Sequence, residues 1–266
     1  MTQVLCINRK GPDMEILDRQ AAFVNRFAEG CNGKLLSAAE AFEYTVDHPI
    51  CVRGMKFTRW VKLAAEQGRK YYYIDNGYFG NHGRKVYFRI IQNNVHDTRD
   101  IIDRPNDRLA LCEVQLKNFT PGSKILLAPP SVKSFTMWDI DQDQWITKTI
   151  AEIKKHTDRP IEVRQKRPRN DRMAVNTMEE ALANDVHCLV TYNSVAACEA
   201  VMFGKPAITL GPNAAGVVCS NTLASIENPY IPTHDERDAW LRHLSYSQFT
   251  FDEMSNGTAW RILNGG

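Results

Sequence analysis

Two short apolar runs flank an alanine-rich segment in the second half of the chain. Residues 188–191 (CLVT) and 207–210 (AITL) have the length and β-branched content of buried strands. Residues 195–203 between them are apolar on nearly every side, which predicts a helix buried on more than one face. Gly204 follows and, with Lys205-Pro206, ends the helix. The pattern predicts a β-α-β unit of a parallel sheet, in which ligands bind where strands end.

Similar runs recur along the chain and alternate with segments of helical period. Strands are predicted at 3–8, 51–54, 71–74, 124–131 and from 161, and helices at 14–29, 56–67, 145–156, 176–182 and 235–245. Two helices begin with the spacing of a capping box. The first has Thr177 or Asn176 as cap with Glu180 able to complete the box, and the second has Thr250 as cap with Glu253 three residues later. This alternation predicts an α/β fold.

The best linker candidate is residues 119–123 (FTPGS), where Pro and Gly are adjacent just before a strand. A length of 266 residues allows two modest domains. We therefore expect a first domain at 1–122, a second at 123–245, and a C-terminal helical segment at 246–266.

Composition narrows the class of protein. The balance of 33 basic against 31 acidic residues commits the protein to neither nucleic acid nor membrane. Seven cysteines without a C-x-x-C pair favour reduced thiols over a zinc site or a disulfide framework. We find no apolar run near 18 residues and no signal peptide, so we expect a cytoplasmic protein without a membrane partner. No metal is expected.

The order N-S-x(4)-E-A-x(3)-G-K-P in residues 193–206 resembles the donor half of glycosyltransferases with two Rossmann-like domains, the GT-B fold. The resemblance implies that Asn193 and Ser194, with Tyr192 before them, hold the phosphates of a nucleotide sugar, and that Glu199 accepts hydrogen bonds from the ribose. It also implies that the final helix crosses back onto the first domain. The alternative is a generic Rossmann-type unit with Glu199 merely exposed. We favour the ligand role, because an unpaired carboxylate among such apolar neighbours would be costly.

Two further segments bear on the donor side. Ser131 stands at the end of the strand predicted at 124–131, where it would face donor phosphate in a GT-B enzyme. The segment R-x-K-R-P resembles, without its His, the K-P-H-P segment of capsule-initiating Kdo transferases, so Arg164 and Lys166 would neutralise the leaving phosphate. A solvated basic face is the plain alternative. Arg167 and Arg169 are candidates for gripping a nucleic-acid backbone instead.

Residues 71–97 supply the candidate acceptor side. Asp75 follows a three-Tyr strand and shares a glycine-bounded stretch with His82, so Asp75 is the expected catalytic acidic residue and His82 the competing base. Tyr78 and Arg89 are expected to bind acceptor. The alternative is a β-hairpin in which Asp-Asn-Gly is turn chemistry. The segment loosely resembles the acidic-Asp-Gly-Phe-Leu-Arg segment of the Kdo transferases. It more closely resembles uncharacterised phage proteins thought to be glycosyltransferases.

These resemblances imply a nucleotide-sugar-dependent glycosyltransferase with no resident cofactor, a UDP-sugar being one candidate co-substrate. The phage resemblance points to a 5-hydroxymethylpyrimidine of phage DNA as acceptor. A surface or capsular saccharide acceptor is the alternative. A non-catalytic nucleotide- or nucleic-acid-binding module, or a nucleotide-sugar epimerase, also stays open.

Overall fold

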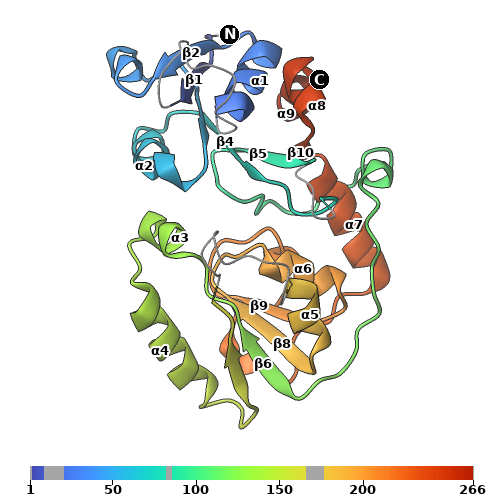
Figure 1. The fold of residues 1–266 in the computed structure, drawn as a ribbon. Coiled ribbons are helices and arrows are strands. Elements are labelled where there is room, and N and C mark those ends of the chain that lie inside the picture. The colour runs from blue at the N-terminus through green and yellow to red at the C-terminus, as the bar shows by residue number, and fades with distance from the viewer. Residues whose placement is uncertain (1, 9–20, 82–85, 166–176, 266) are drawn as a thin grey trace. The chain divides into compact units, whose positions relative to one another are not determined.

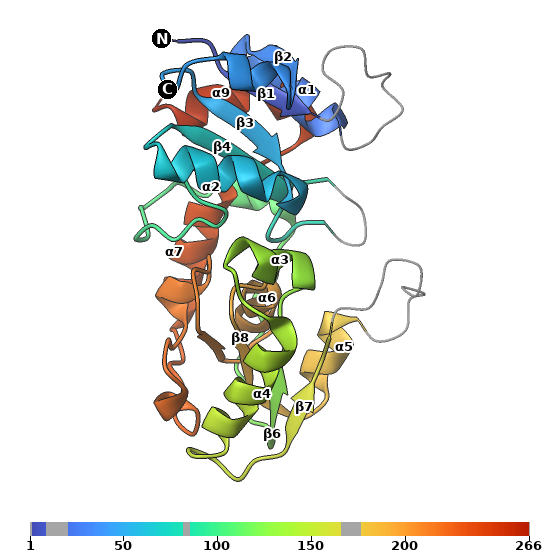
Figure 2. The same cartoon turned by 90° about the vertical axis from the view of Figure 1, so that its left-hand side faces the viewer.

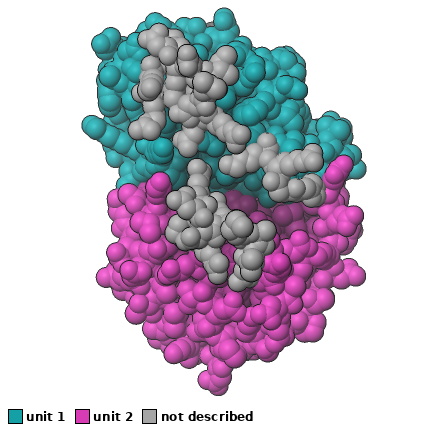
Figure 3. Space-filling view, viewed as in Figure 1, with its two compact units in different colours: residues 1–97, 106–112, 244–266 teal, residues 98–105, 113–243 magenta. Residues whose placement is uncertain are grey.

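The computed structural model describes residues 2–8, 21–81, 86–165 and 177–265, and the chain divides into two compact units (Figure 3). Unit 1 comprises residues 1–97, 106–112 and 244–266, and unit 2 comprises residues 98–105 and 113–243. The predicted first domain ran to residue 122, whereas 98–105 and 113–122 lie in unit 2. The C-terminal residues 246–266 lie in unit 1, as expected for a chain that returns to its first domain.

Unit 1 is built on a six-stranded sheet of order β10-β5-β4-β3-β1-β2 (Figure 1). Its strands are β1 (Leu5–Asn8), β2 (Lys34–Ser37), β3 (Ile50–Arg53), β4 (Tyr71–Asn76), β5 (Phe88–Gln92) and β10 (Gln248–Phe249). The first four pair in parallel, while β5 runs antiparallel to β4 and β10 antiparallel to β5. The β4–β5 pair therefore has the antiparallel pairing of the hairpin alternative.

Helices of unit 1 cover both faces of this sheet (Figures 1 and 2). They are α1 (Ala21–Cys31), α2 (Thr58–Glu66), α8 (Phe251–Ser255) and α9 (Thr258–Leu263), with short 3-10 turns η2 (Glu40–Glu43), η3 (Met55–Phe57) and η4 (Leu109–Cys112). Phe27 of α1 packs with Met254 of α8 and Ala259 of α9 over the sheet in one buried apolar cluster. The ion pair between Arg108 Nη1 and Glu253 Oε1, 2.7 Å long, ties the same C-terminal segment to η4.

Unit 2 contains a four-stranded parallel sheet of order β7-β6-β8-β9. Its strands are β6 (Lys124–Leu127), β7 (Ile161–Val163), β8 (Val186–Thr191) and β9 (Ala207–Thr209). All four carboxyl ends therefore meet at one edge of the sheet. The predicted β-α-β unit corresponds to β8, α6 (Ala196–Met202) and β9.

Unit 2 contains further helices, and capping residues or a glycine mark where some of the helices of the chain begin or end. The further helices are α3 (Val132–Met137), α4 (Gln142–Ile153), α5 (Met178–Ala183) and α7 (His234–Ser245), with 3-10 turns η6 (Gly216–Val218) and η7 (Leu223–Ser225). The last two residues of α7 belong to unit 1. The capping boxes of Thr177 with Glu180 and of Thr250 with Glu253 are confirmed. Gly204 ends α6 with φ of +78°, a conformation that favours glycine. Among the described residues, none of the helices combines the length and apolar content of a membrane span.

Candidate functional site

The carboxyl edge of the unit 2 sheet holds three of the predicted donor residues in one loop, residues 192–195 between β8 and α6. Hydrogen bonds from strand ends fix this loop. The hydroxyl of Thr191 donates to the carbonyl of Ala128 at 2.6 Å, and the backbone N–H of Ser194 donates to Thr191 Oγ1 at 3.4 Å. The loop is thus tied to the end of the neighbouring strand β6 rather than held by its own residues alone.

Asn193 carries an unsatisfied buried donor at this edge. Its side chain is almost fully buried, and its Oδ1 accepts a hydrogen bond from Ser134 Oγ of α3 at 3.1 Å. Its Nδ2 is buried and meets no hydrogen-bond partner in the part of the chain that the structure describes. A buried unpaired polar group costs roughly 1–3 kcal/mol, so such groups call for an explanation. A ligand oxygen would supply the missing acceptor.

Tyr192 lies among aromatic side chains of α3, of its C-terminal end and of α4. Its ring centroid is 5.8 Å from that of Phe135, 6.2 Å from Trp138 and 6.4 Å from Trp145. Burial raises the pKa of the Tyr192 hydroxyl. The Nε1 of Trp138 is a second buried donor without a partner among the described residues. The sequence reading missed Trp138, whose unpaired N–H depends on the packing of α3 and not on a motif.

Asn213 is the clearest functional candidate that the sequence reading missed. It lies in the loop after β9, residues 210–217, and is 3% exposed. Its Nδ2 donates to the Ser194 carbonyl at 2.9 Å and its Oδ1 accepts from the Ala215 N–H at 3.0 Å. A Cβ on Gly211 would lie 2.6 Å from the Tyr192 ring, so glycine allows this loop to lie against Tyr192. The sequence G-P-N-A-A-G, directly after a predicted strand, could have indicated Asn213 as a candidate.

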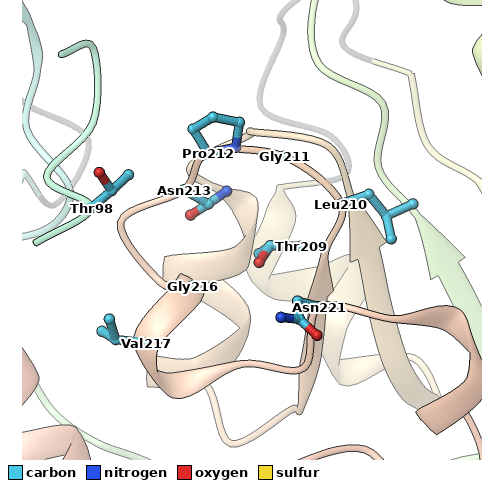
Figure 4. A pocket seen from close by; sticks show the side chains of 9 residues that line it. All are labelled: Thr98, Thr209, Leu210, Gly211, Pro212, Asn213, Gly216, Val217 and Asn221. Atoms are coloured by element: carbon cyan, nitrogen blue, oxygen red, sulfur yellow. The ribbon is translucent and has the colours of Figure 1, made fainter. Parts of the chain in front are cut away.

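The loop after β9 also lines a pocket of about 340 Å³ (Figure 4). The pocket lies within unit 2, at the carboxyl end of β9. None of the predicted donor residues that the structure describes lines it, although Asn213 connects the two regions through Ser194.

The structure corrects the argument made for Glu199. Its side chain is exposed, on the one side of α6 that the buried residues Ala196, Ala197, Cys198, Ala200 and Val201 leave open. The prediction that an unpaired Glu199 would carry a desolvation cost is therefore wrong, because its apolar sequence neighbours are buried on the other sides of the helix. A role of Glu199 in ribose binding stays a prediction.

The other donor candidates lie at or beyond the same edge. Ser131 is half-buried and precedes α3, with its side chain making no capping hydrogen bond. Arg164 follows β7, and its backbone N–H donates to the Leu127 carbonyl of β6 at 2.8 Å. Lys166, Arg167 and Arg169 lie outside the described residues, so their roles stay predictions.

In unit 1 the structure places Asp75 inside β4, opposite Arg89 of β5. Register partners and residues two apart on a strand share a face, which brings Tyr73, Asp75 and Arg89 together. Asp75 Oδ2 accepts from the Tyr73 hydroxyl at 3.0 Å and pairs with Arg89 Nη2 at 3.4 Å, and its Oδ1 accepts from the Asn76 N–H at 2.8 Å. His82 lies outside the described residues.

The two residues of this segment that were expected to bind acceptor are buried. Tyr78 and Arg89 are 3% and 4% exposed. The Tyr78 hydroxyl accepts from the Asp97 N–H at 2.9 Å, and Arg89 donates to the carbonyls of Asn76 and Val95 at 2.7 and 3.1 Å. Both side chains are buried by the antiparallel pairing of β4 with β5 and by the return of β10. Their acceptor-binding roles stay untested predictions.

Opposing effects set the ionisation of Asp75. Burial by itself raises the pKa of this carboxyl. Arg89, the Asn76 N–H, Arg53 and the Tyr73 hydroxyl outweigh burial together, so the pKa lies below its ordinary value. Asp75 is therefore ionised at neutral pH, and Arg53, at the end of β3, is a neighbour that the sequence reading did not connect with it. Within the described residues, no group of three His, Cys, Asp or Glu side chains is placed to hold a metal ion.

Two α/β units, one with an all-parallel sheet and one with a mainly parallel sheet that receives the end of the chain, define a two-domain Rossmann-like fold of the GT-B type. The predicted fold class is confirmed. A solved structure with this fold is KpsC of Thermosulfurimonas dismutans, a beta Kdo 2,4 transferase. It matches with a TM-score of 0.51 and 12% sequence identity over 98% of each chain.

A second similar structure is the KpsC beta Kdo 2,7 transferase of the same organism. It has a TM-score of 0.48 and 13% identity, over 98% of this chain and 99% of that one. No protein family matches the sequence, and no curated protein matches it.

Proposed function

We propose that this protein is a glycosyltransferase that moves a sugar from a nucleotide-sugar donor to a hydroxyl group of a saccharide. The fold shared with a beta Kdo 2,4 transferase over nearly the whole of both chains supports the reaction class. The same likeness favours a saccharide acceptor. It lends no support to the DNA acceptor suggested by the phage resemblance.

The observation that carries the proposal is the buried Nδ2 of Asn193, which has no hydrogen-bond partner among the described residues. This hydrogen-bond donor is buried at the carboxyl edge of a parallel sheet, which is where ligands bind in such folds. A phosphate oxygen satisfies an N–H donor strongly, because the acceptor is charged. In this proposal Asn193 and Ser194 hold the donor phosphate, Tyr192 packs beside it, and Arg164 and Ser131 face it from the neighbouring strand ends.

The acceptor side of the proposal rests on unit 1. An ionised Asp75 is able to take a proton from an attacking hydroxyl, although a carboxyl with a lowered pKa is a weaker base than an ordinary one. His82 is kept as the alternative base.

The test combines an activity screen with one variant pair. The purified chain is incubated with a panel of nucleotide sugars, and the release of free nucleotide is measured with saccharide acceptors and, separately, with hydroxymethylated DNA. Asn193→Ala should weaken donor binding by about 10- to 150-fold, the value of a hydrogen bond to a charged group. Asn228→Ala, at an exposed turn of the same unit, is the matched control.

Three outcomes would contradict the proposal in different parts. Absence of nucleotide release with every donor and acceptor would refute glycosyl transfer. Release of free nucleotide with hydroxymethylated DNA but not with saccharides would refute the saccharide acceptor. Unchanged donor affinity in a folded Asn193→Ala protein would remove Asn193 from the site.

A further inference from the structure

The pocket after β9 has a rigid frame. A parallel bridge joins Ile208 to Ser220, and two backbone hydrogen bonds hold the segments together, from the Thr209 N–H to the Ser220 carbonyl at 2.9 Å and from the Ser220 N–H to the Ala207 carbonyl at 3.1 Å. This pairing brings Asn221 beside Thr209 at the pocket wall (Figure 4). The pocket volume of about 340 Å³ lies within the range of small-ligand sites, roughly 300–1,000 Å³.

Among the described residues, the lining of the pocket mixes polar and apolar groups and carries no charged side chain. Its hydrogen-bonding side chains belong to Thr98, Thr209, Asn213 and Asn221, and the rest of the lining is Gly, Pro, Leu and Val. A phosphate or carboxylate placed here would find no cationic side chain in the lining. The chemistry therefore selects an uncharged group with hydrogen-bonding edges.

Two polar side chains in the lining have hydrogen-bonding groups that are not used by the described residues. The residue Thr209 is 4% exposed, and its hydroxyl makes no hydrogen bond within the described part of the chain. Asn221 is exposed and its amide likewise makes none with the described residues. An amide offers a donor and an acceptor side by side, the arrangement found along the edge of a nucleobase. Leu210 and Pro212 supply apolar contact for a flat ring.

The position of the pocket fits one end of an extended ligand. The sheet order places β9 at the edge opposite β7, which Arg164 follows. Three strand spacings of about 4.8 Å separate these edges, or roughly 14 Å. The loop of residues 192–195 follows β8, which neighbours β9, so a ligand that extends from Arg164 past this loop can place an uncharged part at β9.

We propose that this pocket is the subsite for the nucleobase of the nucleotide-sugar donor, read by Thr209 and Asn221. The inference rests on the proposed function for the identity of the ligand, and it assigns base selectivity to side chains outside the predicted site. The transferred sugar is the alternative occupant.

The test is a binding experiment on the full chain that needs no turnover. Dissociation constants are measured by calorimetry for nucleoside diphosphates with each of the common bases, on the parent, Thr209→Val and Asn221→Ala. Each variant should weaken the preferred nucleotide by about 2- to 12-fold, the value of one neutral hydrogen bond, and should reduce the preference among bases. Thr209→Ser should retain the parent preference, and Asn228→Ala is again the matched control.

The outcomes separate this inference from the proposed function. Equal weakening of all nucleotides would overturn the nucleobase assignment. Weaker binding of the nucleotide sugar with unchanged binding of the nucleoside diphosphate would overturn it as well, because it would place the sugar in the pocket. A folded Thr209→Val protein that transfers sugar with the parent base preference would overturn it too and leave glycosyl transfer standing. Base preference lost in the variants of a chain that transfers no sugar would support the subsite and refute the transferase.

Discussion

Replacing Asp75 by Asn separates a structural carboxylate from a catalytic one. The substitution keeps the side-chain size and removes the charge that faces Arg89. Breaking a buried ion pair costs about 3–5 kcal/mol when the remaining charge is left uncompensated. Here Arg89 keeps two carbonyl acceptors and the Asp75 side chain is 25% exposed, so we expect a smaller loss of about 1–3 kcal/mol in the free energy of unfolding.

The lowered pKa of Asp75 determines how the stability difference between the parent and Asp75→Asn changes with pH. A carboxyl whose pKa is lower in the folded protein stabilises it above the unfolded pKa of about 3.9, and that contribution is lost as the pH falls through the folded pKa. The parent should therefore exceed Asp75→Asn in stability by a constant amount from pH 8 to about pH 5. The difference should shrink at lower pH.

The assay is urea unfolding, with hydrogen exchange of the β4 and β5 amides to report on unit 1 alone. Glu66→Gln, at an exposed position of α2, is the matched control. Equal stability of the parent and Asp75→Asn at every pH would refute the ion-pair reasoning. Turnover is measured on the same protein at a pH where it is fully folded. A loss of about two to four decades would support Asp75 as general base, and near-normal turnover would pass that role to His82.

Three further predictions concern other described residues. Arg108→Met should lower the free energy of unfolding by about 3 kcal/mol and expose residues 244–266 to protease, because it removes bonds to Glu253 and to the Ser245 and Gln248 carbonyls; unchanged proteolysis would contradict this. Glu199→Ala should leave urea unfolding unchanged because the side chain is exposed, and should weaken nucleotide binding by about one to two decades. Arg164→Ala should lower turnover more than acceptor affinity, whereas a purely salt-dependent loss of DNA binding would show an acceptor surface instead.

The parts of the fold that the sequence could predict are governed by local chemistry. The capping boxes depend on residues three apart, and both formed as predicted. Gly204 ends α6 because its own backbone conformation favours glycine. The alternation of apolar runs was enough for the α/β class, since each run reflects the period of a single element.

What the sequence could not predict depends on pairing between distant segments. Tyr78 is buried partly because its backbone N–H donates to Gln248 Oε1, a partner 170 residues away on β10. The environment of Glu199 was predicted wrongly because apolar sequence neighbours do not show which side of a helix is exposed to solvent. Asn213 was missed because its contact with Ser194 exists only when β9 lies beside β8.

The carboxylate of Asp75 in unit 1 and the amide nitrogen of Asn193 in unit 2 differ in how they are satisfied, and this difference bears on where ligand binds. In unit 1 the carboxylate of Asp75 receives a hydroxyl, an N–H and a guanidinium, so the protein needs no ligand to explain it. In unit 2 the Asn193 Nδ2 and the Trp138 indole N–H are buried without described partners. Each such group lowers stability by roughly 1–3 kcal/mol unless a ligand pairs with it. Donor binding in unit 2 therefore has the stronger physical support, and a catalytic role for Asp75 requires that acceptor binding compete with contacts the carboxylate already makes.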